Sequence, residues 1–498
     1  MALSPIFYVK KGLNFVDNWK KRLFCLLLAV LALIFLAACE EPNSSVSGPS
    51  NPTSAQSQPE KGQSGSGDSS GAGTSSTPAE TPVPTAEPLK TFEGEITSAS
   101  KSVLILAGGE GSCTVLLTDE TEHTGAEYLN GNTAAVSYRE SEQDAQGIRA
   151  VKVEVTQSEQ RNTAEKLLAA MTLEEKVGQL FFVRYPDNAA AAVSQYQFGG
   201  YILFGRDFQG ETTDGVRGKI QASQQNAKLP LLIGVDEEGG TVVRVSSNPN
   251  LADEPYWSPR ALYNSGGMQS VSFVEQDKCT LLTSLGINVN FAPVCDISQN
   301  KDDFMYDRSL GQDAETTGEY IRTVVGIYRE NQVGCVLKHF PGYGDNSDTH
   351  TGIAYDNRDY ASFQQKDFLP FQAGIEAGAG CVLVSHNIVS CKDGDYPASL
   401  SQPWHQVLRE ELDFDGVIIT DDLSMGAIRD YCDENAAAVQ AVKAGNDLLC
   451  CTDYDIQIPA VISAVQNGEI SEGRIDESVL RILNWKLELG LINHDITV

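Results

Sequence analysis

The sequence predicts an α/β protein: a (β/α)8 barrel of the TIM type, preceded by a small all-β domain and a disordered linker. From residue 160 onward, short apolar runs alternate with segments of helical period. Short, wholly apolar strands are typical of parallel sheets that are covered on both faces. Eight such runs occur, which is the strand number of a TIM barrel. A doubly wound open sheet is the alternative, and the lack of a glycine-rich dinucleotide motif after the first run favours the barrel.

The eight runs define the expected strands of the barrel, which is assigned to residues 160–498. They are residues 178–183, 200–204, 231–235, 287–294, 334–339, 381–386, 416–420 and 447–451. Helix-like segments such as 320–331 and 436–444 separate several of them. The length of the region is typical of a TIM barrel with insertions.

Two further regions precede the barrel. Residues 89–157 contain short runs with period-two alternation and regular turn signals, which predict a small β-barrel or sandwich. This region holds no catalytic cluster, so we expect a spacer or an accessory binding module. Residues 40–88 are rich in Ser, Gly, Pro and Thr and contain almost no large apolar side chain, which predicts a flexible linker.

The N-terminus predicts export. Basic residues 20–22 precede an apolar run, residues 23–38, that ends at Cys39 in the sequence LAAC. Residues 1–39 have the order of parts of a secretory signal peptide. The LAAC ending resembles a bacterial lipoprotein box, which implies that Cys39 is lipidated and anchors the protein to the cell membrane outside the cytoplasm. An uncleaved transmembrane anchor is the alternative, and it predicts the same side of the membrane.

The composition restricts the partners. A net charge of −31 argues against nucleic acid and against an anionic membrane surface as partners. The eleven cysteines match no zinc-binding spacing, and we expect neither a metal nor a cofactor. Several cysteines lie in or beside predicted strands, which suits small buried apolar side chains: Cys295, Cys335, Cys381, Cys450 and Cys451.

Polar side chains follow five of the predicted barrel strands. Because the carboxyl ends of the strands of a TIM barrel share one mouth, we expect these side chains to lie together. Five strands that end in such groups at the same pole are hard to explain by packing. The residues are Asp236, Asp296 with Arg308 downstream, Lys338 and His339, Ser385, His386 and Asn387, and Asp421 with Asp422.

The segment KHFPGYGDNSDTH, residues 338–350, carries the clearest chemical signal. Asp348 and His350 are one residue apart, a spacing that lets a carboxylate orient an imidazole for proton transfer. Two acids and an oriented base, with arginine and lysine nearby, suit glycoside hydrolysis. Asp421 directly follows an apolar strand, so it is the better candidate for the nucleophile. Asp422 would point differently and bind the backbone.

Several blocks resemble glycoside hydrolase family 3, specifically its β-N-acetylglucosaminidase branch. The resemblance covers residues 162–491. Its blocks, in the order of the family, are MTLEEKVGQLF (171–181), GVDEEGGTVVRV (234–245), NFAPVCDI (290–297), KHFPGYG with the following DTH, TDDLSMGAI (420–428) and RIDESVLRILNWKLELGL (474–491).

The resemblance implies a retaining exo-glycosidase that releases terminal β-N-acetylglucosamine from cell-wall or chitin-type saccharides, as in peptidoglycan turnover. It implies that Asp421 forms the covalent intermediate, that His350 is the acid and base, and that Asp348 orients His350. Few residues follow Cys451, too few for the second domain that supplies the acid in many family members. The residues implied to hold the sugar are Asp236, Arg244, Arg308, Lys338 and His339.

The key segment departs from the family pattern in two ways. Three residues rather than four separate Gly344 from Asp348, and position 343 is tyrosine where histidine is common. Within the family, a β-glucosidase or β-xylosidase and a β-N-acetylglucosaminide phosphorylase are the alternatives, since a neutral histidine repels phosphate less than a glutamate does. A non-catalytic sugar-binding lipoprotein is an alternative of another class. A metallohydrolase using His339, Asp348 and His350 lacks a recognisable ligand set.

Overall fold

The computed structural model describes residues 87–493, apart from residues 101, 110, 127, 129, 130, 145, 146 and 452. The predictions of a signal peptide, of lipidation at Cys39 and of a linker up to residue 86 lie outside the described residues. Among the helices that the structure does describe, none combines the length and the apolar character needed to cross a membrane.

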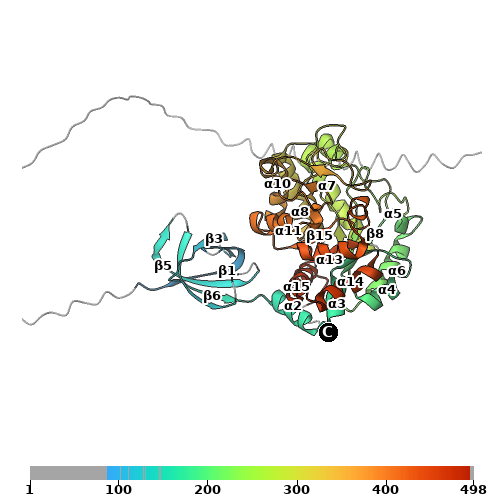
Figure 1. Ribbon diagram of the computed structural model, residues 1–498. Coiled ribbons are helices and arrows are strands. Elements are labelled where there is room, and N and C mark those ends of the chain that lie inside the picture. Colours follow the sequence, from blue (N-terminus) through green and yellow to red (C-terminus); the bar gives the residue numbers. More distant parts are fainter. Residues whose placement is uncertain are drawn as a thin grey trace, which may run out of the picture. The chain divides into compact units, whose positions relative to one another are not determined.

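A six-stranded sheet forms the region that precedes the barrel (Figure 1). Its order is β3-β2-β1-β5-β6-β4, and β3 and β6 also pair. Alternate residues such as Leu104 and Leu106 are buried, as expected for strands that cover one core. The strands are β1 (Lys90–Ala99), β2 (Val103–Gly108), β3 (Gly111–Leu116), β4 (Glu122–Gly125), β5 (Thr133–Asp144) and β6 (Gly147–Thr156).

Eight parallel strands form the barrel, in the order in which they occur in the chain. The last two strands close the ring through a parallel bridge between Ile419 and Leu448, with the Thr420 amide donating to the Leu448 carbonyl at 3.1 Å. The predicted barrel is therefore confirmed over the open sheet. The strands are β7 (Phe181–Arg184), β8 (Gly200–Leu203), β9 (Leu232–Val235), β10 (Val289–Asn290), β11 (Gly334–Phe340), β13 (Cys381–Val384), β15 (Val417–Thr420) and β16 (Leu449–Cys451).

Helices follow the strands in turn and surround them (Figure 1). The principal ones are α4 (Ala189–Tyr196), α6 (Thr213–Gln224), α7 (Pro259–Leu285), α8 (Ala314–Glu330), α10 (Phe368–Glu376), α11 (Gln402–Gln406), α13 (Glu434–Ala444) and α14 (Tyr454–Gln466). Two helices precede the first strand, α2 (Glu159–Ala170) and α3 (Leu173–Gln179), and α15 (Glu472–Glu488) ends the fold. Each of the nine described cysteines is a free thiol, and most are buried.

Two predicted strands lose the most residues in the structure, for identifiable reasons. The first begins only at Phe181, because Thr172 and Glu175 form a capping box and the helix α3 extends to Gln179. The fourth keeps only Val289 and Asn290 as a ladder. Pro293 has no N–H to donate and interrupts the run. The apolar runs locate the strands, and capping and proline set their ends.

The interior of the barrel explains how the polar residues reach its mouth. Phe182 and Phe291 pack inside it with ring centroids 5.4 Å apart. A Cβ on Gly234 would lie 2.7 Å from Phe291, so glycine leaves the room that these rings need. Asp236 lies two residues after Gly234 and therefore points to the same inward side, above the apolar layers.

A buried lysine on α15 reduces the stability of the barrel. Lys486 is fully buried, and its Nζ donates to Oε1 of Gln179 at 2.7 Å. The described part of the chain places no carboxylate against it, and burial lowers the pKa of Lys486 from 10.5 to about 7. Below about pH 7 the folded state must hold a buried charge. As the pH rises from 7 toward 10.5 this penalty is lost, because Lys486 becomes neutral in the unfolded chain too, and folding then no longer has to remove its proton.

Lys486→Met is therefore expected to stabilise the fold at neutral pH. The lowered pKa corresponds to a penalty of at most roughly 4–5 kcal/mol, and the unpaired oxygen of Gln179 would cost about 1–3 kcal/mol. The free energy of unfolding in urea should thus rise by roughly 1–3 kcal/mol at pH 6.5. The gain should shrink at pH 9.5. An equal gain at both pH values would show that packing, rather than charge burial, is responsible.

Candidate active site

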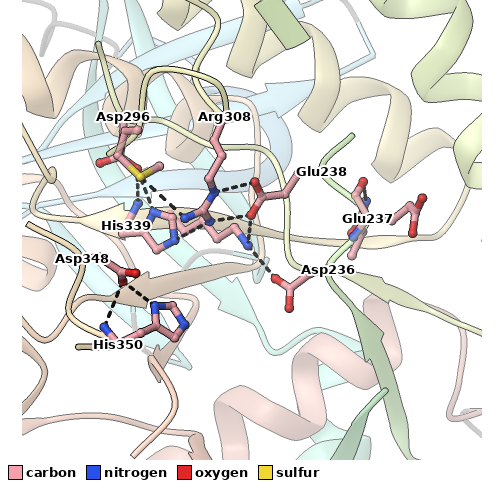
Figure 2. Close-up of polar contacts among 11 residues, drawn as sticks. Asp236, Glu237, Glu238, Asp296, Arg308, His339, Asp348 and His350 are labelled. Atoms are coloured by element: carbon pink, nitrogen blue, oxygen red, sulfur yellow. Dashed lines mark hydrogen bonds and ion pairs between the residues drawn. The ribbon is translucent and has the colours of Figure 1, made fainter. Parts of the chain in front are cut away.

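Four charged side chains form a buried network at the mouth of the barrel (Figure 2). Lys338, on β11, lies 2.7 Å from Oδ1 of Asp236 and 2.6 Å from Oε1 of Glu238. Arg308 contacts both oxygens of Glu238, at 2.7 Å and 2.9 Å. Such two-pronged contacts fix geometry as well as charge. The network joins groups from the loop after β9, the loop after β10 and β11 itself.

Opposite charges set the pKa values in this network. Burial raises the pKa of Glu238, but Arg308 and Lys338 lower it more, so that it lies well below its usual range. Burial lowers the pKa of Lys338, and Asp236 and Glu238 outweigh that effect and raise it. Glu238 and Lys338 are therefore both ionised at neutral pH. Asp236 is the most accessible of them, with 17% of its side chain exposed.

His339 is held in one tautomer by two neighbours (Figure 2). Its Nδ1 lies 2.8 Å from Oδ2 of Asp296, and its Nε2 lies 3.1 Å from Nη2 of Arg308. A guanidinium only donates hydrogen bonds, so Nε2 of His339 accepts and the proton lies on Nδ1. His339 therefore serves as a fixed part of the site, and not as a proton shuttle.

Asp421 and Asp422 follow β15 and have different environments. The amide of Asp422 donates to Oδ1 of Asp421 at 2.8 Å. Burial raises the pKa of Asp421, but the imidazoles of His386 and His339 lower it more, and the net pKa lies below its usual value. Asp422 instead contacts Nε of Arg184 at 2.5 Å and accepts from the amide of Ser424 at 2.8 Å. Asp421 is thus an ionised carboxylate that is not occupied by a cation, and Asp422 is a structural one.

The Asp348–His350 pair lies on the loop between β11 and β12 (Tyr355–Asp356). Nδ1 of His350 lies 2.6 Å from Oδ1 of Asp348, which leaves Nε2 free to exchange a proton (Figure 2). The side chain of His350 is 61% exposed. The loop contacts the segment that follows Asp421, since the amide of Ala427 donates to the carbonyl of Thr349 at 3.2 Å. A Cβ on Gly426 would lie 2.9 Å from the carbonyl oxygen of His350, so the two loops approach closely.

Three of the five residues expected to hold a sugar lie in the buried network, namely Asp236, Arg308 and Lys338, and His339 contacts that network through Arg308. Arg244 does not join it. Its amide donates to Oε2 of Glu237 at 2.8 Å, and its buried Nε has no hydrogen-bond partner among the described residues. Glu237 also accepts from the amide of Val245 at 2.7 Å. Glu237 therefore fixes the backbone of this loop, and among the described residues the Arg244 side chain makes no hydrogen bond to the network.

Glu238 was not among the residues expected at the mouth, and it neutralises Arg308 and Lys338. Asp296 was expected there, but its contact with His339 was not. The sequence signal for Glu238 was its place two residues after Asp236. Its partners lie 70 and 100 positions further along the chain, and only the closed barrel brings them together.

Glu238→Ala is expected to destabilise the fold by about 3–5 kcal/mol, because it leaves two buried cations without their shared carboxylate. Chemical unfolding measures the change. Glu376→Ala is the matched control: Glu376 pairs with Arg322, both side chains are 54% exposed, and exposed pairs contribute about 0–1 kcal/mol. Similar losses in the two variants would mean that burial of the network is not the source of its stability.

A TIM barrel with an ionised carboxylate, a histidine–aspartate pair and a buried set of charged groups at its mouth is typical of enzymes that cleave glycosidic bonds. Residues 172–485 match the glycosyl hydrolase family 3 N-terminal domain. The chain belongs to glycosyl hydrolase family 3, and it is a glycoside hydrolase.

Relatives support a narrower grouping. The beta-hexosaminidase LpqI of Mycobacterium tuberculosis is 33% identical over 332 residues, which cover 64% of this chain and 84% of the relative. A beta-hexosaminidase of Hydrogenovibrio crunogenus is 31% identical over 282 residues, 55% of this chain and 78% of the relative. A family 3 beta-N-acetylglucosaminidase from a Paenibacillus species matches in structure with a TM-score of 0.60 and 31% identity, covering 66% of this chain and 65% of that chain.

Proposed function

We propose that the protein is a retaining, exo-acting β-N-acetylhexosaminidase that releases terminal N-acetylglucosamine from cell-wall or chitin-type saccharides. The observation that carries the proposal is the Asp348–His350 pair on a loop that contacts the segment after Asp421. A carboxylate on one side of the sugar and a proton donor on the other are what glycoside hydrolysis requires. Relatives with the name β-hexosaminidase support the choice of sugar.

The reaction has two steps in this proposal. Asp421 attacks the anomeric carbon, the bond to the leaving oxygen breaks, and Nε2 of His350 gives that oxygen its proton. His350 then takes a proton from water, the water oxygen attacks the same carbon, and Asp421 leaves. Asp348 stabilises the imidazolium that is present before the first step and forms again in the second, since a carboxylate on Nδ1 favours the charged form.

The buried network holds the sugar in this scheme. Asp236 is its most accessible carboxylate and accepts hydrogen bonds from sugar hydroxyls, while Glu238 keeps Arg308 and Lys338 in place beneath it. A metallohydrolase is less well supported, because both ring nitrogens of His339 are already engaged by Asp296 and Arg308. A non-catalytic sugar-binding protein would not need an Asp421 carboxylate with a lowered pKa beside a loop that carries an exposed imidazole.

A panel of aryl β-glycosides tests the proposal. We expect kcat/KM for the N-acetylglucosaminide to exceed that for the glucoside and the xyloside by at least about 10-fold. Hydrolysis should be unchanged by a chelator, and the free sugar should first appear as its β-anomer. A sugar 1-phosphate formed on addition of phosphate would identify a phosphorylase instead. Preference for the glucoside or the xyloside would contradict the proposed substrate.

Lipidation of Cys39 and a location outside the cytoplasm belong to the same proposal. They suit an enzyme that acts on wall saccharides, and they rest on residues 1–39 of the sequence. Fractionation of cells that express the wild type and Cys39→Ser tests them. The wild type should remain with the membrane and the variant should not, whereas retention of both in the membrane would indicate an uncleaved anchor.

A further inference from the structure

Tyr343 lies beneath the loop that carries the Asp348–His350 pair. Its side chain is 1% exposed and packs in a small apolar cluster with Val294, Met305 and Phe304. Its ring meets the ring of His339 edge-on, with centroids 5.4 Å apart. The cluster is built from the loops after β10 and β11; the first of these loops also carries Arg308, and His339 lies near the end of β11.

Two polar contacts connect Tyr343 to both halves of the site. Its amide donates to Oδ1 of Asp296 at 2.7 Å, and the other oxygen of that carboxylate holds His339. Its hydroxyl forms a hydrogen bond with Oγ1 of Thr349, and the amide of Thr349 lies 3.4 Å from the same hydroxyl. Thr349 is fully buried, although its neighbours Asp348 and His350 are both partly or largely exposed.

We infer that Tyr343 is a positioning residue for acid–base catalysis, which fixes His350 relative to the sugar-holding groups through its hydrogen bond to Thr349. Thr349 lies between Asp348 and His350 in the sequence and is the buried residue of the three. The position of its backbone therefore determines where Nε2 of His350 lies. Asp296 binds both Tyr343 and His339 and therefore fixes the position of Tyr343 relative to His339. The inference rests on the proposed function and extends it to a residue outside the reacting groups.

The length of the tyrosine side chain explains the contact. A phenol hydroxyl extends further from the backbone than an imidazole nitrogen does, and Tyr343 thereby reaches Thr349 across the buried space. Proton transfer requires hydrogen-bond distance to the leaving oxygen, so loss of this contact should affect protonation more than nucleophilic attack.

Tyr343→Phe and Thr349→Val each remove one hydroxyl and keep the shape of the side chain. We expect each to lower kcat/KM for an N-acetylglucosamine disaccharide by about 10- to 100-fold, and for a dinitrophenyl N-acetylglucosaminide by less than about 3-fold. The double variant should lose no more than either single one, since both remove the same bond. Hydrogen exchange of residues 345–352 should rise several-fold in each.

Matched controls remove buried hydroxyls elsewhere. Tyr201→Phe breaks the bond to the carbonyl of Ala189, 2.7 Å long, and Thr317→Val breaks the bond to the carbonyl of Asp313, 2.6 Å long. Neither should change the ratio of the two kcat/KM values or the exchange of residues 345–352. His350→Ala is measured in the same series as the reference for a lost proton donor.

The outcomes separate this inference from the proposed function. A selective loss on the disaccharide, with raised exchange in the loop, supports the role of Tyr343. Equal losses on the two substrates, no loss on either, or unchanged exchange would overturn that role even where His350→Ala is selective. A His350→Ala variant that loses the same factor on both substrates would overturn the proposed acid–base role and this inference with it.

Discussion

Asp421→Ala is expected to lower kcat/KM for an aryl N-acetyl-β-glucosaminide by about 10⁴-fold or more, the usual loss when a residue central to covalent catalysis is removed. The carboxylate supplies the electron pair that forms the bond to the anomeric carbon, and two other carboxylates of the described site, Asp422 and Asp236, are already engaged. Asp422 is held by Arg184 and Ser424. Asp236 is held by Lys338. Steady-state kinetics with an activated aryl substrate measure the loss.

Azide identifies the role of the missing group. A small anion can enter the space left by the carboxylate and attack from the same face, so Asp421→Ala with azide should release the α-glycosyl azide. In the wild type, a slowly hydrolysed fluoro sugar should label the peptide that contains Asp421, with a mass increase equal to one glycosyl unit. Both observations depend on a covalent step and would not follow from a role in binding alone.

Asp422→Asn is the matched control for the neighbouring carboxylate. It keeps the size of the side chain and weakens the contact with Arg184, so it should reduce stability and leave an enzyme that azide does not alter. An α-azide product from Asp422→Asn, or a label on Asp422, would show that Asp422 is the nucleophile and would contradict the role given to Asp421. Substantial hydrolysis by Asp421→Ala without azide would indicate that the substrate's own acetamido group attacks.

Most of the barrel could be predicted from the sequence, because buried parallel strands are continuous apolar runs and all eight predicted runs contain a strand. The ends were less predictable. Gly178 and Gln179 were assigned to the first strand, yet they belong to a helix that its capping box stabilises. Pro293 shortens the fourth strand although its neighbours are apolar. The ends of these strands depend on helix capping and on whether a single residue has an N–H to donate. The spacing of apolar residues does not report either property.

The residues of the site also fall into a group that the sequence predicts and a group that it does not. Asp236, Lys338 and Asp421 could be predicted because each ends a recognisable strand, and the fold brings strand ends to one mouth. The role of Glu238 could not, because it depends on two cations that lie far along the chain. Arg244 was expected beside the sugar from its motif alone, and among the described residues its Nε has no hydrogen-bond partner. The position of a residue relative to a strand predicts where its side chain lies in the barrel. Ion pairs between residues of different loops can be recognised only in the closed barrel.

His350→Ala is expected to affect substrates according to their leaving group. For a disaccharide, whose leaving oxygen needs a proton, kcat/KM should fall by about 10²- to 10⁴-fold. For a dinitrophenyl glycoside, which leaves without a proton, kcat/KM should remain within about 3-fold of the wild type, since it reports only the first step. Its kcat should still fall, because the second step needs His350 as a base and the glycosyl-enzyme then accumulates.

Azide distinguishes this loss from that of the nucleophile. In His350→Ala, azide needs no base and attacks the glycosyl-enzyme from the face where water enters, so it should restore kcat and release the β-glycosyl azide. Asp421→Ala should instead release the α-glycosyl azide. The opposite configurations of the two products would assign Asp421 and His350 to opposite faces of the sugar.

Asp348→Asn should give the same pattern as His350→Ala with smaller losses, because the imidazole remains and loses only the carboxylate that stabilises its charge. Equal losses of kcat/KM for both leaving groups, or an α-azide from His350→Ala, would remove His350 from the proton-transfer role and leave it a part of the loop.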